Sequence, residues 1–289
     1  MAQFQKRKEI SQAEEKLLAV QQIVWEAQAK AIAKKEKEAN ELFQQALGMI
    51  QEIKNSPIAY KANKIENEIK EKLIKLNHLE IISQPKILFE IENKDIKPDI
   101  LSRVGDTLYL ADTKKPNLIF FNLNTKEQSI QSLEKPLPMF VQVGEQLVFY
   151  DKEKQQLLVP DAPSVNLFPP AIPFDPIDMA SFGSSIYFLD AKRGQIFKYQ
   201  YLPNQQQLIP MPWLKTAFDI RLRQGISMAI DGNIWILDSE GSIHQFRSGK
   251  WQKTLKLSVW PKLEKPTKIL AKPNIPYLVT VSYTHLRDR

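Results

Sequence analysis

The first part of the chain carries apolar residues at helical spacing. Between Phe4 and Leu76 there is one proline and one glycine, among many Ala, Glu, Lys and Gln, which are good helix formers. Apolar positions recur every three or four residues along three successive stripes. The stripes are Ile10, Ala13, Leu17, Val20, Val24, Ala27 and Ala31; Ala39, Leu42, Ala46, Met49 and Ile53; and Ala62, Ile65, Ile69, Leu73 and Leu76. This pattern predicts three helices within residues 1–84.

The joins between these helices suggest how they pack. The segment NSPIAY interrupts the pattern, which predicts Ser56 as a helix N-cap and Pro57 at the first helical position. The second and third helices are short and tightly joined, so we expect them to pair as a hairpin. The first stripe suits a coiled-coil seam. Residues 10–31 therefore allow either self-association or packing within the chain, and both alternatives stay open.

After Pro85 the pattern changes to short alternating runs separated by Pro, Asn, Gly and Asp, which is typical of strands and turns. Four segments of this part align without a gap: VGDTLYLAD, VGEQLVFYD, FGSSIYFLD and IDGNIWILD. Their last aspartates, Asp112, Asp151, Asp190 and Asp238, lie 39, 39 and 48 residues apart. Each copy is preceded by an apolar strand and followed by a polar turn and another strand. A fifth copy begins in KPTKILAKPNIPYLVTV.

A unit of about 40 residues with this strand order predicts a β-propeller blade. The expected fold is mainly β: an incomplete propeller of four-stranded blades over residues 85–281, preceded by an α-helical stem. Four blades are complete and the fifth is truncated, with KILFEI, residues 86–91, as the expected outer strand of the last one. Residues 282–289 are expected to be a non-native tail. The copies resemble the repeats of NHL and YncE-like propellers.

The repeated aspartates are predicted to be structural. Because Asp112, Asp151, Asp190 and Asp238 end the same strand before turns of different composition, we expect each carboxylate to cap the following turn. Asp231 and Gly232 predict a two-residue hairpin turn. A calcium loop would need oxygen ligands where this stretch carries the apolar run from Ile234 to Leu237.

Catalytic motifs are absent from the sequence: it contains no GxSxG, GxGxxG, GxxxxGK or HExxH. The sequence therefore predicts no enzyme and no cofactor. The alternative is a lactonase-like, metal-dependent propeller hydrolase, for which Asp99, Asp178 and Asp219 are the candidate acids on innermost strands. His78 is expected at a helix end, and His244 in a surface or cross-strand position.

A long insertion before the fourth copy is the predicted recognition element. It contains Trp213, Phe218, Arg221 and Arg223, which we expect to contact a protein, peptide or glycan ligand. The competing interpretation is that the tryptophans pack one blade against the next.

Charge and hydropathy narrow the partners further. The net charge of +7 is spread, with 15 Lys/Arg against 12 Asp/Glu in residues 1–86 and 25 against 21 in the rest. Lysines alternate with glutamates along the helices, so no nucleic-acid partner is expected. The sequence has no cysteine, no signal peptide and no membrane span.

The order of a helical stem, an FEI-type strand and a propeller resembles the C-terminal half of bacterial membrane proteins with an N-terminal PPM-type (PP2C-like) phosphatase domain. That resemblance implies membrane attachment through upstream sequence and an extracytoplasmic propeller. The sequence thus predicts a non-enzymatic binding protein, the sensing or docking part of a larger one.

Overall fold

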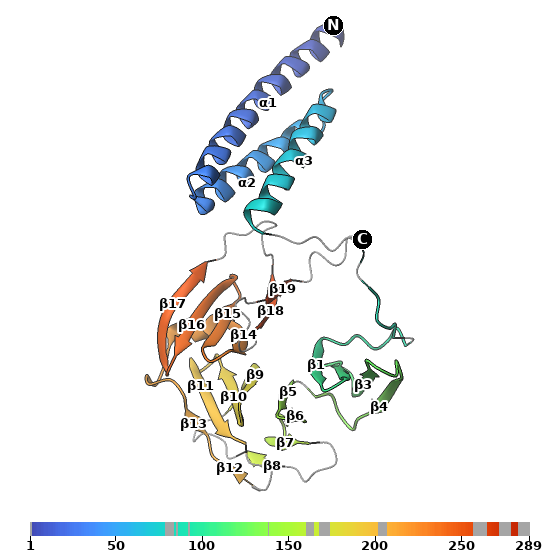
Figure 1. Cartoon of the computed structure of the whole chain (residues 1–289), viewed down its shortest axis with the longest axis vertical. Coiled ribbons are helices and arrows are strands. Elements are labelled where there is room, and N and C mark those ends of the chain that lie inside the picture. The colour runs from blue at the N-terminus through green and yellow to red at the C-terminus, as the bar shows by residue number, and fades with distance from the viewer. Residues whose placement is uncertain are drawn as a thin grey trace. The chain divides into compact units, whose positions relative to one another are not determined.

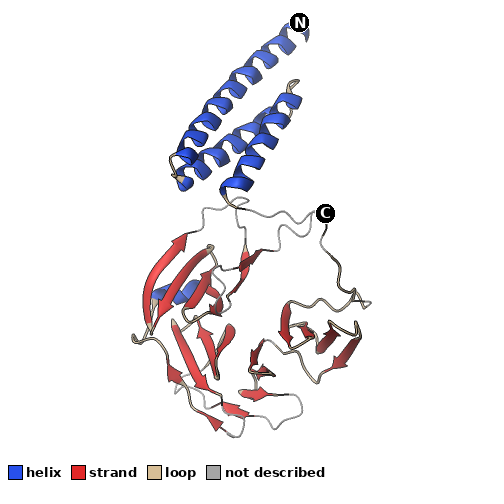
Figure 2. Cartoon of the chain, in the orientation of Figure 1, coloured by secondary structure: helices blue, strands red, loops and turns tan. Residues whose placement is uncertain are grey.

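The chain forms two compact units, a helical one that ends at Lys86 and a strand-rich one that begins at Ile87 (Figure 1). The computed structural model describes residues 2–78, 84, 86–91, 93–137, 139–159, 165–167, 174–201, 207–256, 265–271 and 279–282. The predicted mainly β fold with N-terminal helices is confirmed (Figure 2). Within these residues, no helix combines the length and the apolar character that crossing a bilayer requires. Of the predicted tail, Ser282 ends the last described strand, and residues 283–289 lie outside the described residues.

The helical unit consists of α1 (Ala2–Ile32), α2 (Glu36–Ile53) and α3 (Ala59–Leu76). Helix α2 packs against both α1 and α3, so it is the centre of the unit and not only half of a hairpin. The three predicted stripes meet in one apolar core that includes Val20, Phe43, Ile50 and Ile69. Salt bridges on the surface also join the helices, such as Lys16 to Glu52 at 2.6 Å.

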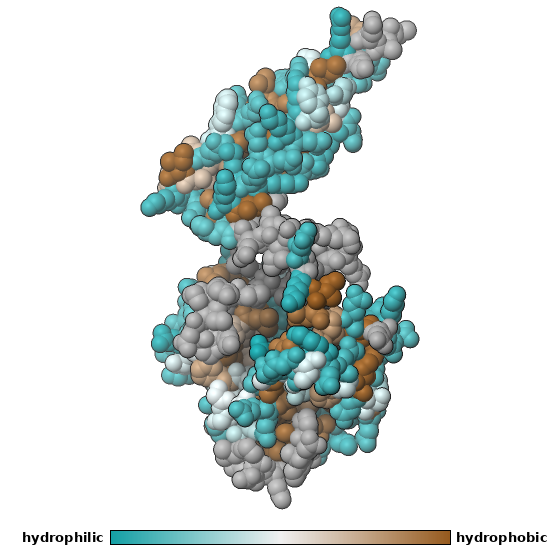
Figure 3. Space-filling view, turned by 45° about the vertical axis from the view of Figure 1, so that its right-hand side comes forward, coloured by the Kyte–Doolittle hydropathy of each residue, from teal (hydrophilic) through white to brown (hydrophobic). Residues whose placement is uncertain are grey.

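The apolar seam of α1 is used inside the chain. Ala13, Leu17, Val20, Val24 and Ala27 are buried against the other two helices. The face of the unit seen in Figure 3 is largely hydrophilic, with scattered hydrophobic side chains. The seam is therefore used for packing within the chain. Leu18 and Trp25, which are 61% and 67% exposed on the other side of α1, leave self-association through residues 10–31 as a prediction.

The predicted start of α3 is wrong. The helix begins at Ala59 with Ile58 as the N-cap residue, and no side chain caps its end. Ser56 Oγ instead accepts a hydrogen bond at 3.4 Å from the amide of Ile58, within the turn before the helix. Pro57 lies in this turn, where the chain reverses direction between α2 and α3.

Among its described residues, the strand-rich unit contains four sheets of four or five strands and a fifth sheet of two strands. The first sheet has β1 (Ile100–Val104), β2 (Thr107–Ala111), β3 (Asn117–Asn122) and β4 (Gln128–Ser132). The second has β5 (Met139–Val143), β6 (Gln146–Asp151), β7 (Gln156–Leu158), β8 (Val165–Leu167) and the parallel β12 (Gln207–Leu208). The third has β9 (Asp178–Phe182), β10 (Ser185–Asp190), β11 (Gln195–Gln200) and β13 (Met211–Pro212).

The fourth sheet has β14 (Gly225–Ile230), β15 (Ile234–Asp238), β16 (Ser242–Arg247) and β17 (Lys250–Lys256). A short 3₁₀ helix, η1 (Ile220–Gln224), precedes it. The last pair is β18 (Pro266–Leu270) with β19 (Val279–Ser282). Apart from β12, neighbouring strands are antiparallel. Each predicted repeat copy, together with the apolar strand that precedes it, provides the first two strands of one sheet.

The second strand of each full sheet is apolar on both faces. In β10, Ile186 and Phe188 enter the core shared with the second sheet, whereas Tyr187 and Leu189 enter the core shared with the fourth. Strand β6 likewise divides its side chains between the cores on its two sides, as does β15. Because successive side chains of a strand point to opposite faces, the second, third and fourth sheets each pack between two neighbours. Among the described residues, the first sheet shares a buried core with the second sheet alone.

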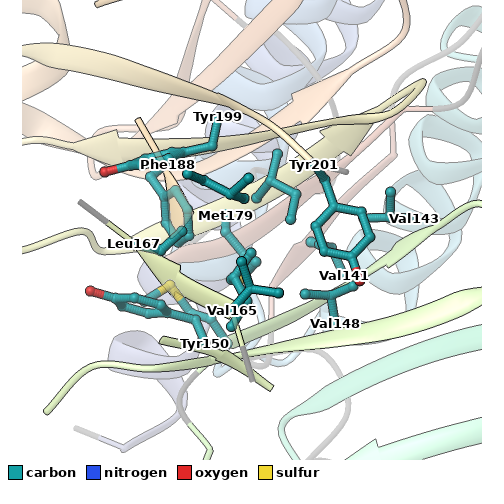
Figure 4. Close-up of a cluster of buried hydrophobic side chains, with 14 of the residues drawn as sticks. Val141, Val143, Val148, Tyr150, Val165, Leu167, Met179, Phe188, Tyr199 and Tyr201 are labelled. Carbon is teal, nitrogen blue, oxygen red and sulfur yellow. The ribbon is translucent and has the colours of Figure 1, made fainter. Parts of the chain in front are cut away.

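The core between the second and third sheets shows how this packing works (Figure 4). Tyr150 and Phe188 meet in a T-shaped contact with ring centroids 4.9 Å apart, and Phe188 meets Tyr199 at 5.6 Å. Small and branched residues, including Val148 and Val165, fill the remaining space. Burial raises the pKa of both tyrosines above the ordinary value, so these rings stay neutral.

The first strands of the sheets lie side by side. Strand β1 contacts β5, β5 contacts β9, β9 contacts β14, and β14 contacts β18. Asp178 on β9 connects three of these sheets. Its carboxylate accepts hydrogen bonds from Ser227 Oγ at 2.9 Å and the amide of Met228 at 2.7 Å, and pairs with Lys268 Nζ at 2.6 Å. Ser227 Oγ in turn accepts from the amide of Ile269 on β18 at 3.2 Å.

Two further predictions are corrected. Residues 86–91 form no strand; Phe89 from this segment stacks instead on Phe121 of the first sheet, with centroids 4.1 Å apart. The turn at Asp231 and Gly232 spans three residues, from 231 to 233, and Gly232 carries its positive φ of 114°. Asp231 accepts a hydrogen bond from the amide of Asn233 at 2.9 Å, which closes the turn without a second positive φ.

Replacing Asp178 with alanine should destabilise the strand-rich unit by about 1–3 kcal/mol, because Ser227 Oγ and the Met228 amide lose their buried acceptor. Urea unfolding at neutral pH measures this free energy. The control is Asp106→Ala, which removes an exposed acid and should change stability by less than about 0.5 kcal/mol. Equal effects of the two substitutions would contradict a connecting role for Asp178.

Candidate functional site

A pocket of about 780 Å³ lies where the first strands of the sheets end. It is contained within the strand-rich unit, and all five sheets contribute to it. Its lining consists of Ser102, Arg103, Gly105, Gln142, Gly144, Ser181, Phe182, Gly183, Ile230 and Ala271. Sites that use several elements of a fold, placed at the ends of its strands, are typical of ligand binding.

The polar lining residues occupy one position of the repeat. Arg103, Gln142 and Ser181 each stand two residues before a turn glycine of their sheet. These glycines, Gly105, Gly144 and Gly183, have φ values of 56°, 59° and 59°. Space would allow a side chain at each of them, so the left-handed backbone of the turn is what favours glycine. The backbone of this turn is therefore the same in the first three sheets, whereas the side chain two residues before its glycine differs from sheet to sheet.

Short hydrogen bonds hold these side chains in place. Arg103 Nε donates to the carbonyl oxygen of Gly105 at 2.8 Å, and Gln142 Nε2 donates to that of Gly144, also at 2.8 Å. Ser181 Oγ donates to the carbonyl oxygen of Gln142, which links the second and third sheets. Arg103 Nη2 also lies 3.5 Å from Asp106 Oδ1, an exposed pair that contributes little energy.

The pocket has a polar side and an apolar side. Ser102, Arg103, Gln142 and Ser181 provide hydroxyl, amide and guanidinium groups from the first three sheets. Phe182, Ile230 and Ala271 provide apolar surface from the third, fourth and fifth. Among these lining residues there is one charged group and no acid–base pair. The arrangement can bind and orient a molecule, and Arg103 is the group that would recognise negative charge.

The four repeated aspartates stand at the ends of the second strands, directly before the turns. Asp112 Oδ1 accepts from the amides of Lys114 at 2.9 Å and Lys115 at 3.2 Å. The equivalent oxygens of Asp151, Asp190 and Asp238 each accept from at least one amide two to four residues further on. All four side chains are buried, and each cap satisfies at least one amide of the following turn.

Their surroundings shift the pKa values in different directions. The amide of Lys97, with those of Lys114 and Lys115, lowers the pKa of Asp112 below its ordinary value against the effect of burial. Burial would raise the pKa of Asp151, but the hydrogen bond from Lys135 Nζ at 2.8 Å and the turn amides lower it. Burial raises the pKa of Asp190, against the hydrogen bond from the amide of Arg193 at 3.1 Å.

The part of the predicted insertion from residue 213 to residue 224, which we call the strap, lies between the third and fourth sheets. Trp213 is half-buried, meets Tyr187 at a centroid distance of 6.5 Å, and packs on the core between these sheets. This is the packing role that was the competing interpretation. Phe218, Arg221 and Arg223 lie further along the strap, with Arg221 over the ring of Trp251 at 4.5 Å. The structure brings none of them into the pocket lining.

The acids of the hydrolase hypothesis contact separate partners. Asp99 accepts from the amide of Thr113 at 2.9 Å, Asp178 connects sheets, and Asp219 pairs with Arg221 Nη2 at 2.8 Å. Within the part of the chain that the structure describes, no three His, Cys, Asp or Glu side chains are grouped to hold a metal ion. His244 has its expected cross-strand role, but it is buried between Asp238 and Thr254.

The polar pocket residues were missed by the sequence analysis. The signal in the sequence is the repeat position two residues before the turn glycine, not the long insertion. There the matching copies carry Arg103, Gln142 and Ser181. A column that changes chemistry within an otherwise repeated pattern is not required by packing.

Comparison with known proteins gives little similarity in sequence. No family model matches the chain, and no curated protein matches it.

Among solved structures, the chain is similar to PorZ, a bacterial surface component of the type-IX secretion system of Porphyromonas gingivalis. The identity is 17% and the TM-score 0.42, over 65% of this chain and 24% of PorZ. It is also similar to a chain of the nidogen/laminin complex, with 12% identity and a TM-score of 0.43, over 62% and 68% of the two chains. An auxiliary nutrient-binding protein of Bacteroides thetaiotaomicron gives 10% identity and a TM-score of 0.44, over 59% of this chain and 53% of its own.

The opposite pKa shifts of Asp112 and Asp190 predict opposite pH dependences. The pKa of Asp112 is lower in the folded chain than in the unfolded chain, where it is about 4. Its charge therefore stabilises the fold above a pH of about 4, and this stabilisation is lost as pH falls through the folded pKa. For Asp190 the folded pKa is the higher one, so its contribution is present at low pH and lost as pH rises through it.

We therefore expect Asp112→Asn to cost about 1 kcal/mol at neutral pH, with a smaller cost in acid. The free energy of unfolding of Asp190→Asn, relative to the wild type, should be highest at neutral pH and should decrease as pH falls. Urea unfolding of the wild type and both variants, from neutral to acidic pH, measures how each free energy of unfolding depends on pH. Parallel profiles would show that the turn aspartates share one electrostatic role.

Proposed function

We propose that the chain is a non-enzymatic binding protein in which the strand-rich unit is a β-propeller of the NHL or YncE-like kind. Two observations support this architecture. The repeat copies each provide the first two strands of one sheet, and the first strands lie side by side from β1 to β18. A propeller places its innermost strands around a central channel. The pocket at the ends of these strands would be the mouth of that channel.

The pocket is the proposed ligand site, and its chemistry favours a small organic ligand that carries a carboxylate beside an apolar group. Arg103 is held by Gly105 and can present its remaining guanidinium N–H groups to a carboxylate. Gln142 and Ser181 add hydrogen-bonding groups, and Phe182 with Ile230 offers apolar surface on the other side. The observation that carries the proposal is this convergence of chemically different side chains at one repeated position.

The wider role of the protein follows from this proposal. A ligand pocket on a repeated scaffold, joined to a helical stem, suits the sensing or docking part of a larger protein. A protein, peptide or glycan could present the carboxylate and the apolar group. Membrane attachment through an upstream segment, and the phosphatase domain that the stem resembles, stay predictions. So does the lactonase-like alternative, for which calcium- or zinc-dependent hydrolysis lost in Asp99→Asn is the test.

Phenylacetate is a suitable probe of the pocket, because it combines a carboxylate with an apolar ring. We expect the full chain to bind it, and to bind its neutral amide about threefold to tenfold more weakly, because the charge-assisted contact with Arg103 is lost. Ligand-observed NMR titration measures both affinities. In Arg103→Gln the preference for the charged probe should disappear.

Arg7→Gln is the matched control, since it removes an exposed arginine of the helical unit without touching the pocket. It should leave both affinities unchanged. Failure of the full chain to bind either probe, or an equal loss in the control, would contradict the proposed site.

A further inference from the structure

The distal part of the insertion presents aromatic and cationic side chains on the surface of the strand-rich unit. Phe218, Ile220 and Trp251 are 46%, 61% and 42% exposed. Arg221 lies 4.5 Å from the centroid of the Trp251 ring, and Arg223 lies 5.8 Å from that of Phe218. We call these five residues the arginine–aromatic patch. None of them lines the pocket proposed as the ligand site.

Two turn glycines fix the strap that carries this patch. A side chain on Gly194 would meet the carbonyl oxygen of Asp219 at 2.6 Å and the ring of Phe218 at 2.7 Å. A side chain on Gly249 would meet the carbonyl oxygen of Trp213 at 2.5 Å. The amides of Asp219 and Lys215 donate to the carbonyl oxygens of these same glycines, at 2.8 and 2.9 Å. The strap is therefore seated on the third and fourth sheets and is not a free loop.

The arginines are also held before any partner arrives. Asp219 caps η1 by accepting from the amide of Arg221 at 3.0 Å, and it pairs with Arg221 Nη2 at 2.8 Å. Arg221 is thereby kept against Trp251, and its Nε is buried without a hydrogen-bond acceptor among the described residues. Ordering an arginine in advance reduces the conformational entropy that binding would cost.

The charge of the strap indicates what kind of partner fits. Residues 213–224 contain Lys215, Arg221 and Arg223 against the single acid Asp219. The acid is buried and already paired, whereas Lys215 and Arg223 are exposed. Positive charge next to exposed aromatic rings complements a segment that carries both carboxylates and apolar side chains.

We propose that the arginine–aromatic patch is a second binding surface, which docks an acidic segment of a partner protein with at least one apolar side chain. The apolar side chain lies on Phe218 and Ile220, and carboxylates of the segment pair with Arg223 and Lys215. This role is independent of the pocket. The two sites lie on different parts of the sheets, and either proposal can fail without the other.

The probe is a fluorescein-labelled peptide of glutamate pairs separated by leucines. Fluorescence anisotropy with the full chain should show binding that weakens as salt rises from about 0.05 to 0.5 M, because the charges are exposed. The same peptide with glutamine in place of glutamate should bind roughly tenfold more weakly. Arg223→Glu should weaken binding of the acidic peptide by at least about tenfold.

Two matched controls separate the patch from the general positive charge of the chain. Arg7→Glu makes the same change of charge on the helical unit and should leave the affinity unchanged. Phe218→Ser should weaken binding, whereas Ile130→Ser, at a residue 44% exposed on β4, should not. All four variants change exposed side chains, and unchanged melting temperatures will show that they fold.

The proposal is overturned if the acidic peptide does not bind, or if it binds no better than its glutamine version. It is also overturned if Arg7→Glu weakens binding as much as Arg223→Glu. That last result would mean that the peptide responds to net charge and not to the patch.

Discussion

The strand-rich unit depends on one constraint, which is that the second strands of its second, third and fourth sheets must bury both of their faces. Side chains of a strand alternate between faces, so an apolar residue at every position is stable only between two other sheets. In β10 this divides Ile186 and Phe188 from Tyr187 and Leu189. No sheet of this kind can be stable alone in water. The repeat is needed because each sheet completes the core of the next.

The same constraint explains why the pocket lies where it does. Core positions must stay apolar in every copy, and the turn glycines must keep a positive φ, so the repeat preserves both. Packing ends at the last residues of the first strands. Arg103, Gln142 and Ser181 stand there, beside a repeated turn but outside the cores. Recognition groups can therefore differ between sheets without cost to the stacking that holds them.

Periodicity was enough to predict the elements whose burial is periodic. The three apolar stripes became three helices, and the copies ending in Asp112, Asp151, Asp190 and Asp238 became the second strands of four sheets. The start of α3 was mispredicted because Ser56 and Pro57 are equally suited to a turn and to a helix N-terminus. The unpaired segment 86–91 has the composition of a strand. Its partner, however, depends on contacts between distant segments, which no local pattern records.

The site was harder to predict, because its parts are distant in sequence and ordinary in composition. Arg103 and Ile230 line one pocket although more than 100 residues separate them. No spacing rule connects such residues before the order of the sheets is known. The insertion was noticed for its length and its tryptophan, yet Trp213 is explained by packing, whereas Phe218, Arg221 and Arg223 stay on the surface. The length of the insertion identified the segment, but it could not distinguish the residues that pack against the sheets from those that are exposed.

The turn aspartates show how far a repeat determines chemistry. The sequence requires an acceptor at the end of each second strand, and the four carboxylates meet this need in the same way. Their ionisation depends on residues outside the repeat, such as Lys97 for Asp112 and Lys135 for Asp151. Where burial has the larger effect, as at Asp190, the pKa rises instead. Repetition thus determines geometry, whereas the neighbours of each copy determine its electrostatics, and the same division separates the common turns from the different side chains of the pocket.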